Sequence, residues 1–125
     1  MPRAVLEEAR IHPAIRQTIA TDNAEIVREV ETAIAGNDVV IVGMAMNPFP
    51  KKARAMLDGA GQAYRYLEYG SYFKDWRRRG ALKMWCGWPT LPMVFVKGTL
   101  VGGAQDLGRL IKSGELATLL AAPRA

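Results

Sequence analysis

The residues best placed to support chemistry lie where an apolar run meets a segment bracketed by prolines. Val39–Val42 is a β-branched run typical of a buried strand, and the tetrapeptide Asn47–Pro50, Asn-Pro-Phe-Pro, follows it closely. Asn is a favoured helix N-cap, and Pro at the next position loses only an amide that has no partner there. The segment therefore predicts a strand, a tight junction and a helix starting at Pro48. In open α/β sheets such a junction is where ligands bind.

One cysteine and one histidine are the other candidates for a nucleophile or a metal ligand. Cys86 lies among aromatic residues, where a lone cysteine is more often a small buried hydrophobe than a nucleophile. The alternative stays open that Arg79 and Lys83 acidify its thiol. His12 has no Cys or His at ligand spacing, so no metal site is predicted. A single cysteine excludes an intramolecular disulfide and favours a cytoplasmic setting.

Composition limits the class of protein. The chain has 125 residues, of which 50% are hydrophobic and 23% charged, which is typical of one soluble globular domain. No apolar run approaches the ~20 residues of a membrane span, and the acids near the N-terminus argue against a secretory signal. A net charge of +5 suits acidic ligands. Basic and aromatic residues do not alternate as they do in proteins that bind single-stranded nucleic acid, so nucleic acid is not an expected partner. A membrane is not an expected partner either.

Periodicity predicts the elements that position these residues. Residues 1–36 are expected to be helical in short pieces, and the last piece has an amphipathic pattern. After the first strand and the Pro48 helix we expect a strand at 63–68, a helix capped by Ser71, a hairpin of 93–96 and 99–101, and helices from Asp106 and Glu115. This order predicts an α/β fold with a central four-stranded mixed sheet flanked by helices, preceded by extra N-terminal helices.

Three segments resemble motifs of the glutaredoxin family. Asn47–Pro50 stands where glutaredoxins carry Cys-Pro-(Tyr/Phe)-Cys or Cys-Gly-Phe-Ser, with Asn at the nucleophile position. Trp88–Pro92 is similar to the Trp-Pro-Thr-(hydrophobic)-Pro of monothiol glutaredoxins, and Gly102–Leu107 to Gly-Gly-x-Asp-Asp-Leu. Together, at this spacing, they identify the chain as glutaredoxin-like, which implies a thioredoxin-like fold. The expected domains are an N-terminal helical extension, 1–22, and a glutaredoxin-like domain, 23–121.

The resemblance implies a site for glutathione or a similar ligand. Basic side chains would meet the glycyl carboxylate, the segment before the family's cis-proline would pair with the cysteinyl part, and a helix N-terminus would receive the γ-glutamyl end. The implied residues are Asn47, Phe49, Arg79, Lys83, Thr90, Leu91, Pro92, Gly103, Ala104 and Gln105. Two departures, Met44 for a usual Lys and Gln105 for a usual Asp, imply a weaker or altered ligand.

Position 47 decides the expected activity. Asn47 has neither a nucleophile nor an iron ligand, so no catalytic residue and no iron–sulfur cluster are expected there. The leading hypothesis is non-catalytic binding of glutathione, a related small thiol or an extended peptide in the cis-Pro groove of a degenerate active site. Two alternatives stay open. One is a residual glutathione-linked thiol–disulfide oxidoreductase using Cys86, and the other is an adaptor acting through the N-terminal helices and the basic face 77–83.

Overall fold

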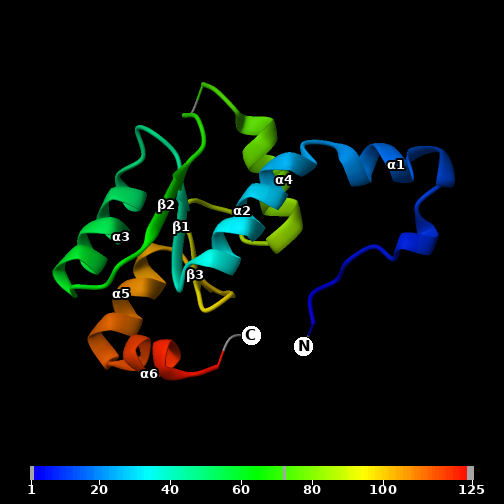
Figure 1. Cartoon of the computed structure of the whole chain (residues 1–125). Coiled ribbons are helices and arrows are strands. Elements are labelled where there is room, and N and C mark those ends of the chain that lie inside the picture. The colour runs from blue at the N-terminus through cyan, green and yellow to red at the C-terminus, as the bar shows by residue number, and fades with distance from the viewer. Residues whose placement is uncertain (1, 72, 124–125) are drawn as a thin grey trace.

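A four-stranded mixed sheet forms the centre of the molecule (Figure 1). The computed structural model describes residues 2–71 and 73–123. Strand β1 (Val39–Gly43) runs parallel to β2 (Arg65–Glu68) and antiparallel to β3 (Met93–Val96), and β4 (Thr99–Gly102) pairs antiparallel with β3. The resulting order, β2-β1-β3-β4, is the mixed sheet that the sequence predicts.

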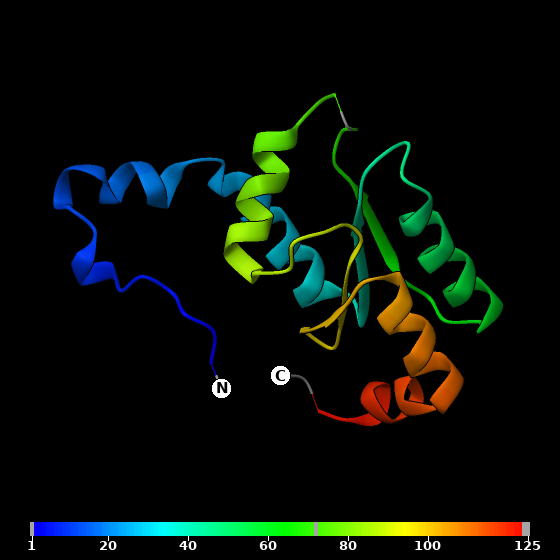
Figure 2. The same cartoon turned by 180° about the vertical axis from the view of Figure 1, so that it is seen from behind.

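Helices cover both faces of the sheet (Figures 1 and 2). Helices α2 (Ala24–Gly36) and α4 (Trp76–Cys86) lie on one face, and α3 (Pro48–Gly59), α5 (Ala104–Ser113) and α6 (Glu115–Ala121) on the other. None of these helices, nor any other in residues 2–71 and 73–123, is both long and apolar enough to cross a membrane.

Strand β1 divides the hydrophobic core into two halves. Val40 and Val42 face α2 and α4, whereas Val39 and Ile41 face α3 and α5. All five residues of β1 are buried, because helices cover both of its faces. This two-sided burial explains why the strand is a continuous apolar run and does not alternate with polar residues.

The predicted hairpin is confirmed, and a two-residue turn closes it. Lys97 has a φ of 51° and Gly98 a φ of 84°, so both turn residues are left-handed. That backbone matches the twist of paired antiparallel strands, and Gly adopts it without strain. The turn joins β3 to β4 and leaves the start of β3 at the opposite end of the sheet.

The N-terminal part differs from the expected helical run. Residues 2–7 are not helical, and a short 3₁₀ turn, Glu8–Arg10, precedes α1 (Pro13–Thr21). Helix α1 begins after His12, whose Nδ1 accepts a hydrogen bond from the Ala14 amide at 3.0 Å. A residue that precedes proline avoids the helical region, so helix cannot run through His12. Neither the turn nor α1 contains a buried residue, and α1 projects away from the sheet (Figure 2).

Helix α4 begins later than the sequence predicts. Ser71 does not cap it; Ser71 instead bridges to Lys74, and the helix starts at Trp76 after Asp75. Gly70 permits this turn, because its φ of 62° is strained for other residues and a Cβ there would meet the Lys74 carbonyl. The delayed start carries the helix through Cys86, which is its last residue and not part of a loop.

Gly43 allows the closest approach between β1 and α3, and this contact can be tested. A Cβ at residue 43 would lie 2.7 Å from the Pro50 Cβ and 3.0 Å from the Tyr66 ring. We expect Gly43→Ala to lower the free energy of unfolding by ~1–3 kcal/mol, since the rigid proline ring cannot move aside. Urea denaturation measures the change. Gly36→Ala is the matched control, because nothing lies within 4 Å of its new methyl group. Equal stabilities of the two variants would contradict this account.

Candidate functional site

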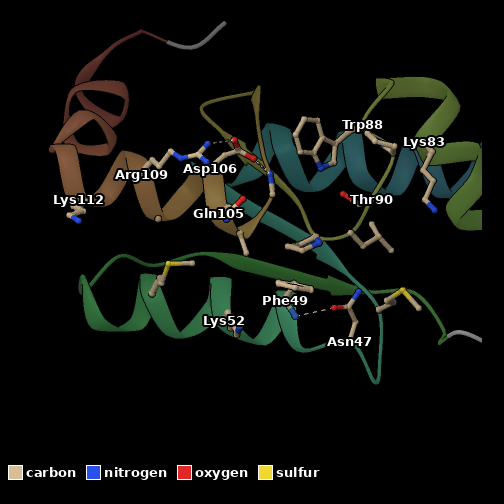
Figure 3. Close-up of a pocket in the computed structure, with 18 residues that line it drawn as sticks. Asn47, Phe49, Lys52, Lys83, Trp88, Thr90, Gln105, Asp106, Arg109 and Lys112 are labelled. Atoms are coloured by element: carbon tan, nitrogen blue, oxygen red, sulfur yellow. Dashed lines mark hydrogen bonds and ion pairs between the residues drawn. The ribbon is translucent and has the colours of Figure 1, made fainter.

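A cleft of about 950 Å³ opens where the starts of α3 and α5 face the segment before β3 (Figure 3). It lies at the carboxyl end of β1, where the sequence predicts a site. Three distant parts of the chain contribute residues of the predicted ligand set. Those that line the cleft are Asn47, Phe49, Lys83, Thr90, Leu91, Pro92, Gly103, Ala104 and Gln105. The resemblance therefore selected side chains that the fold brings together.

Asn47 is the N-cap of α3, as its position before Pro48 predicts. Its Oδ1 accepts a hydrogen bond from the Phe49 amide at 2.9 Å, and the side chain is half-buried (Figure 3). Phe49 is exposed and points into the cleft, whereas Pro50 is buried against Gly43. The carboxamide is neutral and its oxygen already serves the helix, so this side chain can orient a ligand but cannot attack one.

The segment before β3 presents backbone to the cleft. The Leu91–Pro92 peptide bond is cis, and Thr90 is exposed at the rim. Within residues 2–71 and 73–123, the Leu91 N–H and C=O groups have no hydrogen-bond partner. Only Pro92 separates Leu91 from Met93, the first residue of β3, so the two groups can pair with an extended ligand in the manner of an added strand.

The N-terminus of α5 forms the opposite wall. The Gly103 amide donates to Asp106 Oδ2 at 3.0 Å, which caps the helix. The amides of Ala104 and Gln105 belong to the first turn, where no intrahelical acceptor exists. Unpaired amides and the helix dipole together favour a carboxylate at this position. Ala104 is buried and Gln105 is exposed, so Gln105 can adjust to a ligand.

Arg79 is the one predicted ligand residue that lies away from the cleft, which corrects the sequence-based assignment. Its side chain is buried and donates to the carbonyl oxygen of Tyr69 at 3.0 Å and to that of Lys74. Because α4 begins at Trp76, Arg79 lies in its first turn and faces back onto the turn that follows β2. Lys83, one turn later, lines the cleft.

The turn between β2 and α4 is also connected to α2 through Tyr69. The Tyr69 hydroxyl donates to Glu29 at 2.8 Å. Burial of the phenol, and then this hydrogen bond, raise the pKa of Tyr69 above its ordinary value. Arg79 and Tyr69 therefore hold the turn between β2 and α4 in place, and this turn sets the position of Lys83. Neither side chain lines the cleft.

Cys86 lies apart from Asn47. Its Sγ accepts from the Trp88 amide at 3.4 Å and lies 3.6 Å from the Met93 sulfur. The half-buried side chain borders a second cavity of about 690 Å³, together with Trp85 and Phe95. The thiol therefore borders a different cavity from Asn47, although Lys83 and Trp88 on either side of it line the cleft.

Several cleft residues were missed by reasoning from sequence. They are Met44, Lys52, Met56, Trp88, Pro89, Asp106, Gly108, Arg109 and Lys112. A signal existed, because Phe49, Lys52 and Met56 recur at helical spacing, as do Gln105, Gly108 and Lys112. Over the two described ranges, no group of three or more His, Cys, Asp or Glu side chains is placed to hold a metal ion.

The different roles of Arg79 and Lys83 can be separated by measurement. We expect Arg79→Leu to lower the free energy of unfolding by ~1–3 kcal/mol, because it leaves the Tyr69 carbonyl without its donor and the Lys74 carbonyl with the Ser71 amide alone. Lys83→Leu removes a half-exposed cation from the same helix. It should change the free energy of unfolding by less than ~0.5 kcal/mol. Urea unfolding of both variants checks this. Equal losses would show that Arg79 has no special structural role.

Comparison with known proteins identifies relatives of the chain. No protein-family model matches it. The chain is 46% identical over 94 residues to a glutaredoxin-like protein of Dictyostelium discoideum, which covers 75% of this chain and 76% of that one. It is 34% identical over 99 residues to a mitochondrial glutaredoxin-2 of Bos taurus, covering 75% of this chain. The match spans 60% of the length of the bovine protein.

Solved structures show the same fold. A structure of oxidized glutaredoxin 2 from Chlamydomonas reinhardtii is 27% identical with a TM-score of 0.66, covering 80% of this chain and 94% of that one. A buckwheat glutaredoxin–glutathione complex is 19% identical with a TM-score of 0.67, covering 79% and 90%. The expected thioredoxin-like fold is confirmed. With these structural neighbours and the Dictyostelium relative, the chain belongs to the glutaredoxin family.

Proposed function

We propose that this protein binds glutathione in the cleft between α3, α5 and the segment before β3, without thiol–disulfide exchange at residue 47. The observation that carries the proposal is the spacing of complementary groups around one cleft. Lys83 lies at one end, the unpaired backbone of Leu91 lies between, and the free amides of the α5 N-terminus lie at the other wall. A related small thiol or an extended peptide would use the same groups.

Glutathione matches these groups chemically. It carries a carboxylate at each end, a peptide backbone between them and a central thiol. One carboxylate would meet Lys83, and the other the amides of Ala104 and Gln105. The backbone would pair with Leu91, which is the pairing that extended peptides make with a free strand edge. The buckwheat protein with the same fold is described as a complex with glutathione, which supports this assignment.

Asn47 argues for binding in place of exchange. A thiol at a helix N-cap is acidified by the helix and attacks disulfides as the thiolate, but Asn47 offers only a carboxamide. The chain's single thiol, Cys86, borders a different cavity. Met44 and Gln105 stand where the family pattern has a charged Lys and a charged Asp. Because these two charges are missing, we expect only moderate affinity for glutathione. The cytoplasmic setting stays a prediction, because the relatives include proteins named mitochondrial and chloroplastic.

A second candidate function, docking of a partner protein, is supported by the N-terminal region. Val5, Leu6, Ile15 and Ile19 are exposed, with 65%, 56%, 51% and 54% of their surface accessible. Apolar side chains gathered on a projecting helix and its preceding segment are a common basis for protein contacts. An adaptor role of this kind is compatible with ligand binding in the cleft, since the two regions do not share residues.

Glutathione binding is tested by titration with amide chemical shifts as the readout. We expect the Leu91, Ala104 and Gln105 amides to shift most, and Lys83→Glu to weaken binding about tenfold, equivalent to ~1.4 kcal/mol. Arg77→Glu is the control, because it makes the same charge change on α4 at a residue outside the cleft. Unchanged shifts at all three amides would rule out glutathione as the ligand.

The chemical role of residue 47 is tested by restoring a thiol. We expect Asn47→Cys, made together with Cys86→Ser, to gain glutathione-linked disulfide reductase activity, because the α3 N-terminus stabilises a thiolate. The chain with Asn47 should show none of this activity. If the unmodified protein is already as active as the double variant, and loses its activity on Cys86→Ser alone, exchange through Cys86 replaces the binding proposal.

A further inference from the structure

The cleft continues beyond the residues assigned to glutathione. Lys52 and Met56 of α3 and Gly108, Arg109 and Lys112 of α5 line this continuation, which we call the α3–α5 groove (Figure 3). In that view Lys83 and Lys112 lie at opposite ends of the cleft. The proposed glutathione contacts use none of the groove residues, so their arrangement calls for its own explanation.

The floor of the groove is apolar and adaptable. Gly108 lies so close to α3 that a Cβ there would be 3.2 Å from the Met56 sulfur. Beneath it, Ala53 and Leu107 are buried and join the two helices. Glycine within a helix usually lowers stability. Gly108 nevertheless leaves space at the floor of the groove, beside the flexible thioether of Met56. Such a floor accepts varied side chains and does not select one rigid shape.

The walls of the groove carry uncompensated positive charge. Lys52 and Lys112 are exposed and make no ion pair with any residue in 2–71 or 73–123. The Lys52 ammonium lies 5.1 Å from the centre of the Phe49 ring. The carboxylate of Asp106 is already engaged, because one oxygen accepts from the Gly103 amide and the other is 3.4 Å from Arg109. An anionic occupant would therefore meet two unpaired cations, Lys52 and Lys112, beside the Arg109–Asp106 ion pair.

The length of the groove indicates an extended occupant. From Lys52 to Met56, and from Gly108 to Lys112, each helix rises by four residues, roughly 6 Å at ~1.5 Å per residue. Extended chain advances ~3.3 Å per residue, so the groove holds about two residues beyond the glutathione end. The free backbone of Leu91 at that end can pair with peptide. The residues named as lining the α3–α5 groove include no aromatic side chain on which a nucleic-acid base could stack.

We propose that the α3–α5 groove binds an extended acidic peptide segment of a partner protein, with its Asp or Glu side chains on Lys52 and Lys112. The inference deepens the proposed function, on which it rests for the shared cleft, and it names the class of partner. The peptide would enter past Phe49 and run between the two helices. Binding of this kind depends strongly on ionic strength, because both lysines are exposed to solvent.

The test uses the full chain and fluorescent peptides of about eight residues, a length that spans the cleft at ~3.3 Å per residue. One peptide alternates Glu with Thr, and its partner replaces every Glu by Gln. At low salt, fluorescence anisotropy should show that the Glu peptide binds at least ~10-fold more tightly than the Gln peptide. This difference in affinity should become smaller as the salt concentration rises. Equal affinities for the Glu and Gln peptides would overturn the inference.

Charge reversal locates the site. Lys52→Glu with Lys112→Glu should weaken the Glu peptide at least ~10-fold, while glutathione binding changes less than ~2-fold. The matched control is Lys51→Glu with Arg28→Glu, because both residues are exposed, carry the same charge and lie outside the cleft. An equal loss in the control pair would overturn the inference, because it would show attraction by net charge alone. Tighter binding of a single-stranded RNA of similar length, abolished by the Lys52 and Lys112 changes, would also overturn it.

The two proposals fail separately. If the Glu peptide binds as expected but glutathione causes no shifts, the groove assignment stands and glutathione is replaced as the ligand of the other end. If glutathione binds and the Glu peptide does not, the groove assignment falls and the proposed function stands.

Discussion

The contact between Pro50 and Gly43 is the constraint on which the site depends. The missing side chain at the end of β1 lets the proline ring of the first turn of α3 lie directly on the strand backbone. This sets both the distance and the direction of the helix relative to the sheet. Since β1 is buried on both faces, it cannot shift to accommodate a different approach. The N-terminus of α3 therefore opens into the cleft in a fixed position.

Two helix N-termini and one free backbone segment then define what the cleft can bind. The start of α3 is closed by Asn47 and the start of α5 by Asp106, yet the amides of Ala104 and Gln105 stay without an intrahelical acceptor. Opposite them, the N–H and C=O of Leu91 have no hydrogen-bond partner in the described part of the chain. Groups of these kinds are suited to binding carboxylates and peptide backbone. None of them supplies a nucleophile, which is why binding is the better proposal for this member of a family whose chemistry depends on a thiol.

The basic residues of the chain divide into supporting and binding roles according to burial. Arg79 is buried and satisfies two carbonyls of the turn after β2, so it stabilises the protein. Lys52 and Lys112 are exposed and lack ion pairs in the described part of the chain, so their charge is available to a ligand. Net charge by itself does not distinguish these roles. The same positive charge stabilises the fold at one place and is proposed to bind a partner at another.

What the sequence by itself determined is local. The Asn47 cap and the Lys97-Gly98 turn depend on neighbouring residues, and each was predicted correctly. The apolar run Val39–Val42 likewise predicted a buried strand, which is confirmed. The start of α4 depends instead on the turn that the chain makes at Gly70 after β2. Arg79 of α4 holds this turn in place through its hydrogen bond to the Lys74 carbonyl.

Tertiary structure alone decided that Arg79 faces inward, that Cys86 lies away from Asn47, and that α3 and α5 face each other. Helical spacing shows which residues share a face of a helix. It does not show which distant helix that face meets, because that choice is made by burial of the whole core.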